Sequence, residues 1–252
     1  MILAIANNKG GVAKTTTAVN LSAALALRGK SVLLVDMDSQ RSASLSLGIR
    51  NAPATLAGVL FKGAPAREAI TDTTVQGLSL LPAHPELAGA DIVLGAVKGR
   101  ERILSRALAP VEAQYDFIIL DSPPSLSLLV VNALAACRCF IVPTVPQYLA
   151  LEGLSGFLRA VDQMRAGGIE AGALLGILFT AIDYRTRAAV EIAEMIRAHF
   201  GRDVFRTEIR VNTRLAEAPS FGQSIFQYDS HSTGAAAYIE LAAEVLKRSR
   251  AI

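Results

Sequence analysis

The stretch that decides the fold runs from an apolar segment into a glycine-rich loop, and it reads Ile2-Leu3-Ala4-Ile5-Ala6-Asn7-Asn8-Lys9-Gly10-Gly11-Val12-Ala13-Lys14-Thr15-Thr16-Thr17. Its first residues are typical of a buried strand, and the Ala- and Leu-rich residues 15–28 that follow predict a helix capped by Gly29. A strand, a glycine-rich loop and a helix in this order are the usual context of a phosphate-binding loop. Adjacent glycines let successive backbone N–H groups converge on phosphate oxygens at the positive end of the helix.

The side chains of this loop indicate nucleotide chemistry. Lys14 offers a point charge to the β- and γ-phosphates, Thr15 can place its hydroxyl on Mg²⁺, and Thr16 can donate to the α-phosphate. The strict pattern G-x-x-x-x-G-K-[ST] is not met, because Asn8 and Ala13 stand where that pattern has glycines. The loop is therefore a variant of the common phosphate loop.

The rest of the chain alternates short β-branched runs with helical patterns. Buried strands are expected at residues 2–7, 31–36, 117–121, 139–145 and 174–180, and further helices at 149–166, 186–200 and 233–248. This series predicts an α/β fold with a single doubly wound, mostly parallel sheet flanked by helices. A chain of 252 residues suits one such domain, over residues 1–252, and is too short for two independent cores. The ligand crevice is then expected at the carboxyl ends of the strands.

Composition excludes several classes of protein. No apolar run approaches the roughly 20 residues of a membrane span, and the first residues lack a signal-peptide pattern, so a soluble cytoplasmic protein is expected. The net charge of +3 is a mild indication of an anionic partner. Cys137 and Cys139 are expected to be apolar fillers on one face of a strand rather than a disulfide or a metal site.

Acidic residues follow two of the expected strands. Asp36 and Asp38 come at the end of the second strand, and strand alternation sends both side chains the same way. The apolar run at 117–121 ends in Asp121, which is the arrangement of a Walker B group that holds Mg²⁺ through water. Pro123 and Pro124 stiffen the loop that follows. Three carboxylates are therefore predicted near the phosphate loop.

These motifs together resemble one family. The run Lys9-Gly10-Gly11-Val12-Ala13-Lys14-Thr15-Thr16 resembles the deviant Walker A motif of the ParA/MinD family. The segment beginning at Asp36 resembles the family's Asp-x-Asp-Pro-Gln switch, and the segment beginning at Asp121 resembles its Asp-x-Pro-Pro motif. The similarity continues along nearly the whole chain and is closest in pattern to ParA/Soj segregation ATPases.

The resemblance implies an ATP- and Mg²⁺-dependent ATPase that forms a homodimer. Lys9 would reach the partner subunit's nucleotide, Lys14 would contact its own, and Asp38 would orient and activate the attacking water. The metal would lie beside Thr15, Asp36 and Asp121. The expected nucleotide-binding residues are Lys9, Gly10, Gly11, Val12, Ala13, Lys14, Thr15, Thr16 and, on the adenine side, Asn212.

Three positions depart from the family pattern. Ala13 replaces a glycine, and its methyl group is expected to require a negative φ. Ser39 replaces the proline of the switch and Arg41 its following glycine, so a more mobile switch loop is expected.

The resemblance also implies partners. In the ParA/Soj subgroup the ATP-bound dimer binds double-stranded DNA without sequence preference, and the matching arginines here are Arg185 and Arg214. A ParB-like protein is expected to stimulate slow hydrolysis, and the protein is expected on the nucleoid. The C-terminal residues 244–252 lack the bulky apolar face of a membrane anchor, so no membrane partner is expected.

Alternatives remain open at this stage. The same switch could position a protein cargo over the nucleoid, and the changes at Ala13 and in the switch are compatible with an ATP-locked regulator that does not hydrolyse. A Rossmann dehydrogenase is the weakest alternative, because the first turn lacks G-x-G-x-x-G and carries two lysines.

Overall fold

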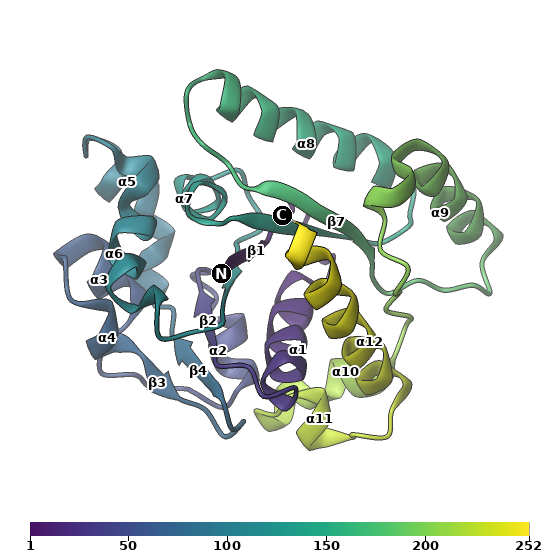
Figure 1. Cartoon of the computed structure of the whole chain (residues 1–252), viewed down its shortest axis with the longest axis horizontal. Coiled ribbons are helices and arrows are strands. Elements are labelled where there is room, and N and C mark those ends of the chain that lie inside the picture. The colour runs from purple at the N-terminus through teal and green to yellow at the C-terminus, as the bar shows by residue number, and fades with distance from the viewer. Residues whose placement is uncertain (252) are drawn as a thin grey trace.

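Within residues 1–251, the part of the chain that the computed structural model describes, seven strands form one sheet in the order β3-β4-β2-β5-β1-β6-β7 (Figure 1). The strands are β1 (Ile2–Ile5), β2 (Val32–Asp36), β3 (Thr71–Asp72), β4 (Leu78–Leu81), β5 (Phe117–Asp121), β6 (Cys139–Thr144) and β7 (Ala173–Phe179). Neighbours are parallel except at the edge, where β3 pairs antiparallel with β4. The mostly parallel sheet predicted from the sequence is confirmed.

Helices cover both faces of this sheet. They are α1 (Lys14–Leu27), α2 (Ser42–Ser46), α3 (Leu56–Lys62), α4 (Ala66–Ala69), α5 (Ala90–Leu94), α6 (Ile103–Glu112), α7 (Leu128–Ala136), α8 (Ala150–Ala166), α9 (Arg187–Phe200), α10 (Thr213–Glu217), α11 (Ile225–Tyr228) and α12 (Thr233–Arg248). Helices α3 to α9 contribute to one apolar core, whereas α1, α2 and α10 to α12 contribute to the other. Among the described residues, no helix combines the length and apolar character needed to cross a bilayer.

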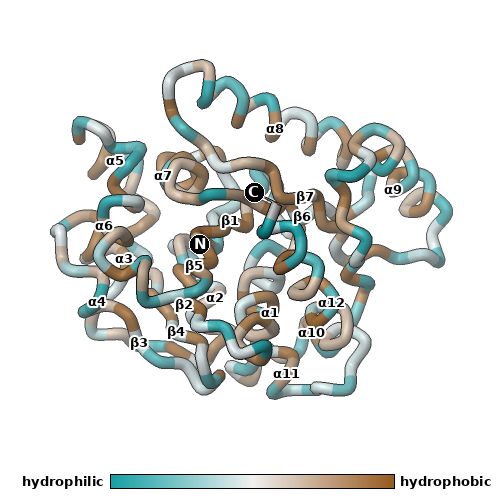
Figure 2. The backbone as a smooth tube through the Cα atoms, in the orientation of Figure 1, coloured by the Kyte–Doolittle hydropathy of each residue, from teal (hydrophilic) through white to brown (hydrophobic). Residues whose placement is uncertain are grey.

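The strands are apolar on both faces because each face packs against helices. In β1, Ile2 and Ala4 belong to one core and Leu3 and Ile5 to the other, and all four are buried. Figure 2 shows the strands mostly in hydrophobic colours, whereas α8 alternates between hydrophilic and hydrophobic residues. A continuous apolar run is the expected signature of a central parallel strand.

The two cysteines correct one expectation. Cys137 caps α7 and belongs to one core, whereas Cys139 begins β6 and belongs to the other, so they do not share a face. Cys137 precedes the strand, and the rule of alternation therefore does not apply to it. Burial raises the pKa of Cys137 to about 12 and that of Cys139 to about 11, so both are apolar fillers as expected.

The C-terminal helix α12 is fastened to the rest of the domain by polar contacts. The Glu244 carboxylate accepts hydrogen bonds from Arg206 N at 3.0 Å and from Thr207 N and Oγ1, both at 2.9 Å. The Thr17 and Tyr238 hydroxyls lie 3.3 Å apart in the buried contact between α1 and α12. The helix that follows the phosphate loop therefore rests on the last helix of the chain.

Candidate active site

The loop between β1 and α1 is closed by its own polar groups. The buried Lys14 ammonium donates to the backbone oxygen of Lys9 over 2.9 Å. Asn7 donates through Nδ2 to the Pro143 oxygen over 2.8 Å, and its Oδ1 accepts from Lys9 N over 3.0 Å. Burial lowers the pKa of Lys14 from its usual value. Sequence reasoning missed Asn7 as the anchor of the loop, because an asparagine after a strand has no distinctive pattern.

The other predicted residues of the loop line its mouth. Gly10 and Gly11 are exposed, Thr15 and Thr16 are half-buried, and Val12 is buried beneath them. The sequence predicted these positions as a phosphate cradle, and the structure brings them together at the carboxyl end of β1. Their individual roles stay predictions.

Ala13 contradicts the expectation of a negative φ. Its φ is 57° and its ψ is 35°, in the left-handed region, where an L-residue other than glycine costs about 1–2 kcal/mol. Its carbonyl accepts from Thr17 N over 2.9 Å, which is the first hydrogen bond of α1. The expectation was wrong because the path of the loop into the helix, rather than the side chain, fixes this conformation.

Two strand-end carboxylates face the same edge of the sheet. Asp36 and Asp121 lie opposite each other in the register of β2 and β5, and both are fully buried. Neither carboxylate oxygen of Asp121 has a hydrogen-bond partner among the described residues. Burial, and then the charge of Asp36, raise the pKa of Asp121 well above its usual value. The nearby Thr15 side chain and the positive charge of Lys14 lower this pKa, but by less.

The environment of Asp121 fits a Mg²⁺ site. A buried carboxylate without donors is costly unless a cation or its bound water compensates it. Within the described residues no three acidic, His or Cys side chains form a cage of their own. Mg²⁺ in phosphate-transfer sites is held by only one or two protein groups together with phosphate and water, so Thr15 and Asp121 are a sufficient set.

Asp36 is engaged by the segment that follows its strand. Its Oδ2 accepts from Ser44 N at 2.8 Å and from Ser44 Oγ at 2.7 Å, and its Oδ1 accepts from Asp38 N at 3.2 Å. Burial raises the pKa of Asp36 to about 6 in spite of these bonds. The Asp36 carboxylate therefore positions the loop that follows β2. Its contact with a metal ion stays a prediction.

The switch segment forms a hydrogen-bonded turn. Asp38 is half-buried, and its Oδ1 accepts from Gln40 N over 2.9 Å. Its carbonyl accepts from Arg41 N over 2.8 Å, and Arg41 has a φ of 59°, again in the left-handed region. The structure therefore shows how the turn is built, and the greater mobility expected from Ser39 and Arg41 stays a prediction.

The segment after Asp121 lies against the phosphate loop. Ser122 Oγ donates to the Ile5 oxygen over 2.8 Å, which ties the end of β5 to the end of β1. A β-carbon on Gly10 would lie 3.9 Å from that of Pro124, so the two loops are in contact range. A change in one loop can therefore be passed to the other.

Asn212 is the N-cap residue of α10. Its Oδ1 accepts from Leu215 N over 3.1 Å, and its Nδ2 donates to Thr233 Oγ1 over 2.9 Å. It lines an open cavity of about 510 Å³ together with Tyr184 and Arg185. A helix-capping role accounts for its side-chain contacts, and adenine recognition stays a prediction.

The two arginines expected to bind DNA are exposed and paired with acids. The Arg185 side chain is 84% exposed and lies 2.8 Å from the Asp183 carboxylate, which holds the pKa of Asp183 down at about 2. The Arg214 side chain is 53% exposed and lies 3.0 Å from Glu217. Both are available at the surface.

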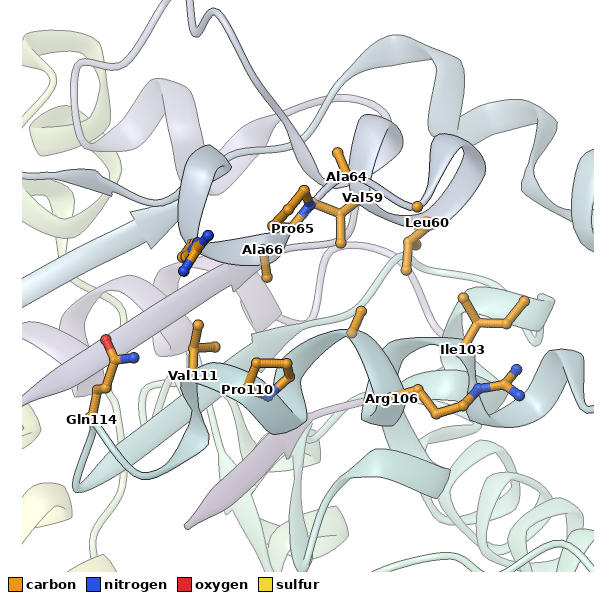
Figure 3. Close-up of a pocket in the computed structure, with 13 residues that line it drawn as sticks. Val59, Leu60, Ala64, Pro65, Ala66, Ile103, Arg106, Pro110, Val111 and Gln114 are labelled. Carbon is orange, nitrogen blue, oxygen red and sulfur yellow. The ribbon is translucent and has the colours of Figure 1, made fainter.

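A mainly apolar groove lies elsewhere on the molecule. It has a volume of about 490 Å³ and runs between α3 and α4 on one side and α6 on the other. Figure 3 shows Val59 and Leu60 facing Ile103 and Pro110 across it. It contains none of the residues predicted for the nucleotide.

A parallel sheet with a phosphate loop after its first strand, a lysine at the start of the next helix and a buried aspartate at a neighbouring strand end defines the class of P-loop nucleoside triphosphatases. Residues 1–169 match the AAA domain family. The chain is 48% identical to the chromosome-partitioning ATPase Soj of Thermus thermophilus over 98% of its length and 95% of that protein's. It is 44% identical to the sporulation initiation inhibitor protein Soj of Bacillus subtilis, over 97% of each chain. The chain belongs to the ParA/Soj family of partitioning ATPases.

A solved relative adds information on ligands. The structure described as cobyrinic acid a,c-diamide synthase from Mycobacterium smegmatis contains ADP and magnesium and has a TM-score of 0.86, with 35% identity over 99% of this chain and 95% of that one. Its nucleotide and metal agree with the cofactors predicted for this chain, ATP and Mg²⁺.

Proposed function

We propose that this chain is an ATP-dependent, dimerising ATPase that binds DNA without sequence preference and segregates chromosome or plasmid DNA together with a ParB-like protein. A single domain over residues 1–252 carries the activity. The observation that supports it most directly is the Asp121 carboxylate, buried without a hydrogen-bond partner among the described residues and lying close enough to Lys14 to feel its charge. Carboxylates whose pKa is strongly shifted by burial and a charged neighbour cluster at functional sites.

The roles of the nucleotide-site residues follow from their positions. The backbone of residues 10–15 and the Lys14 ammonium hold the phosphates, and Thr15 and Asp121 hold the metal. Bound Mg²⁺ neutralises charge on the phosphates. Asp38, half-buried at the mouth of the site, orients the attacking water and accepts its proton. Lys14 exchanges its present bond to the Lys9 oxygen for a phosphate oxygen.

Lys9 supports the dimer part of the proposal. The described hydrogen bonds of Lys9 involve only its backbone N–H and carbonyl, so its ammonium group is available to the partner subunit's nucleotide. ATP bound between two subunits would then link dimer formation to the nucleotide state. Hydrolysis, slow until a ParB-like partner stimulates it, would separate the subunits.

Arg185 and Arg214 support the DNA part. An exposed ion pair with an acid is worth only about 0–1 kcal/mol, so a DNA phosphate can replace Asp183 or Glu217 at little cost. Dimerisation doubles the number of such arginines on one assembly. Contacts to phosphates carry no base information, which agrees with binding that lacks sequence preference and keeps the protein on the nucleoid.

The test is DNA binding by fluorescence anisotropy with ATP, ADP or no nucleotide, across a salt series. We expect ATP-dependent binding, with a log–log salt slope that becomes shallower by about 0.9 for each phosphate contact removed in the Arg185→Ala/Arg214→Ala variant. Arg67→Ala, an exposed arginine of α4, is the matched control. Equal binding in all nucleotide states, or in Lys14→Ala, would refute the switch.

A second assay separates hydrolysis from binding. Asp38→Ala is expected to bind ATP and dimerise but to release phosphate at least about a hundredfold more slowly, the range of a lost general base. Ala13 and Arg41 favour one alternative, an ATP-locked regulator, because each is a non-glycine residue held in the left-handed region at the site, at a cost of about 1–2 kcal/mol. Wild-type turnover that stays at zero with a ParB-like partner would establish that alternative. If the cargo is a protein rather than DNA, the chain should still bind the nucleoid, but deletion of its gene should leave DNA partition normal.

A further inference from the structure

A small polar pocket lies beside the switch turn and apart from the phosphate loop. It has a volume of about 130 Å³ and is formed by the turn at Arg41, the loop at residues 49–55 and the end of β4. Its polar lining consists of Arg41, Ser44, Arg50, Asn51, Thr55 and His84. Organic ligands usually occupy about 300–1,000 Å³, so this pocket suits a small inorganic ion with a little water.

The pocket concentrates positive charge and hydrogen-bond donors. Arg41 reaches across it, and its Nη1 donates to the backbone oxygen of Arg50 over 3.0 Å. The side chains of Arg41 and Arg50 form no ion pair within residues 1–250, whereas Arg185 and Arg214 each have an acidic partner. Arg41 and Arg50 both line this one small cavity, and two cations close to each other repel unless an anion lies between them.

His84 is the third basic residue of the lining. His84 Nδ1 accepts from Glu86 N over 3.3 Å, which leaves Nε2 as the N–H donor of the neutral ring. The Glu86 carboxylate, 3.6 Å from Nδ1, is the acidic group beside the ring, and it lies on the side away from Nε2. The lining itself contains no acidic side chain.

One lining residue, Ser44, is buried and is tied to the switch segment. Ser44 is 1% exposed, its Oγ donates to Asp36 Oδ2 over 2.7 Å, and the same oxygen accepts from Ala83 N over 3.2 Å. Ser44 therefore links the Asp36 carboxylate to the lining of the cavity. An occupant of the pocket would contact the loop that Asp36 holds in place.

We propose that this pocket binds a small tetrahedral oxyanion of the size of inorganic phosphate, held by the guanidinium groups of Arg41 and Arg50. Planar guanidinium groups bind such oxygens through paired, charge-assisted hydrogen bonds. The site does not depend on the proposed partitioning function, because no residue of the phosphate loop lines it. Its occupant would stabilise the segment from Arg41 to residue 55 in the conformation described here.

The position of the anion is tested by crystallography. Crystals of the full chain with ADP and Mg²⁺ are soaked in selenate, which has the shape of phosphate and a selenium anomalous signal. We expect an anomalous peak between Arg41 and Arg50. A peak only at the phosphate loop, or none at all, would overturn the proposal.

Affinity is tested by calorimetric titration of inorganic phosphate into the same complex at constant ionic strength. Arg41→Gly is expected to bind at this site about tenfold or more weakly, because a charge-assisted contact is lost. This variant also removes a left-handed non-glycine residue, so it is expected to fold. Arg50→Ala should behave in the same way, and Arg67→Ala, outside the pocket, should match the wild type.

An unchanged titration in both Arg41→Gly and Arg50→Ala would overturn the proposal. Binding of a fluorescent ATP analogue, measured on the same samples, reports on the phosphate loop. If the wild type does not bind the analogue, the proposed function is contradicted. The phosphate titration tests the anion site independently of that result.

Discussion

Replacing Ala13 by glycine should stabilise the nucleotide-free protein. The residue is held at φ 57° by the path of the loop into α1, at a cost of about 1–2 kcal/mol for an L-residue. Glycine removes that cost but gains about 0.4–1 kcal/mol of entropy in the unfolded chain. The net expectation is a gain of about 0.5–1 kcal/mol, which corresponds to a rise in Tm of roughly 1–4 °C for a domain of this size.

The matched control is the same chemical change at a residue with ordinary helical geometry. Ala236 is exposed within α12, and Ala236→Gly should cost about 1 kcal/mol. Urea unfolding followed by circular dichroism, with calorimetry for Tm, should therefore give opposite signs for the two variants. If Ala13→Gly loses stability as Ala236→Gly does, the argument from backbone strain is wrong.

Three further outcomes follow from contacts described above. Burial alone would raise the pKa of Glu244, but its hydrogen bonds hold it below the usual value, so its stabilisation is present above about pH 4.3 and is lost as the pH falls. Glu244→Gln should therefore lower the free energy of unfolding by about 2 kcal/mol at pH 7 and by much less at pH 3. The control Glu240→Gln, at an exposed position, should leave the free energy of unfolding unchanged at both pH values. An equal loss at both pH values in Glu244→Gln would contradict the role of the Glu244 charge. Gly176→Ala would bring a β-carbon within 2.6 Å of the Phe205 ring and should cost roughly 1–3 kcal/mol in urea unfolding; no loss would show that the ring can move freely. Asn212→Ala removes the cap of α10 and should cost about 1 kcal/mol; an unchanged affinity for a fluorescent ATP analogue would remove Asn212 from the adenine site.

The central part of the fold could be predicted from the sequence because its strands are buried on both faces. Phe117–Asp121 was predicted without error, and the bounds of β1, β2, β6 and β7 differ from the prediction by one or two residues. The phosphate loop and Asp121 were predicted for a related reason, since strand-end position and residue type together are distinctive. The sheet edge was missed because β3 (Thr71–Asp72) is short and polar, and pairing with β4 rather than any pattern of its own makes it a strand.

The details of the site depended on tertiary contacts that a linear pattern does not contain. The left-handed conformation of Ala13 is imposed by the closure of the loop onto α1, and residue type predicted the opposite. Ser44, eight residues beyond Asp36, satisfies that carboxylate through both its backbone and its hydroxyl. Asn7 bonds to Pro143 across the sheet, a pairing that local sequence does not indicate.

The central position of β1 has a consequence for synthesis of the chain. Leu3 pairs with Ile119 on one side and with Cys139 on the other, so β1 is synthesised well before either of the strands that flank it in the sheet. Contacts between such distant segments form slowly, and an unpaired apolar strand is a substrate for chaperones. The phosphate loop cannot take shape before that pairing. Unfinished chains would therefore not bind ATP. They could not form inactive dimers with completed molecules.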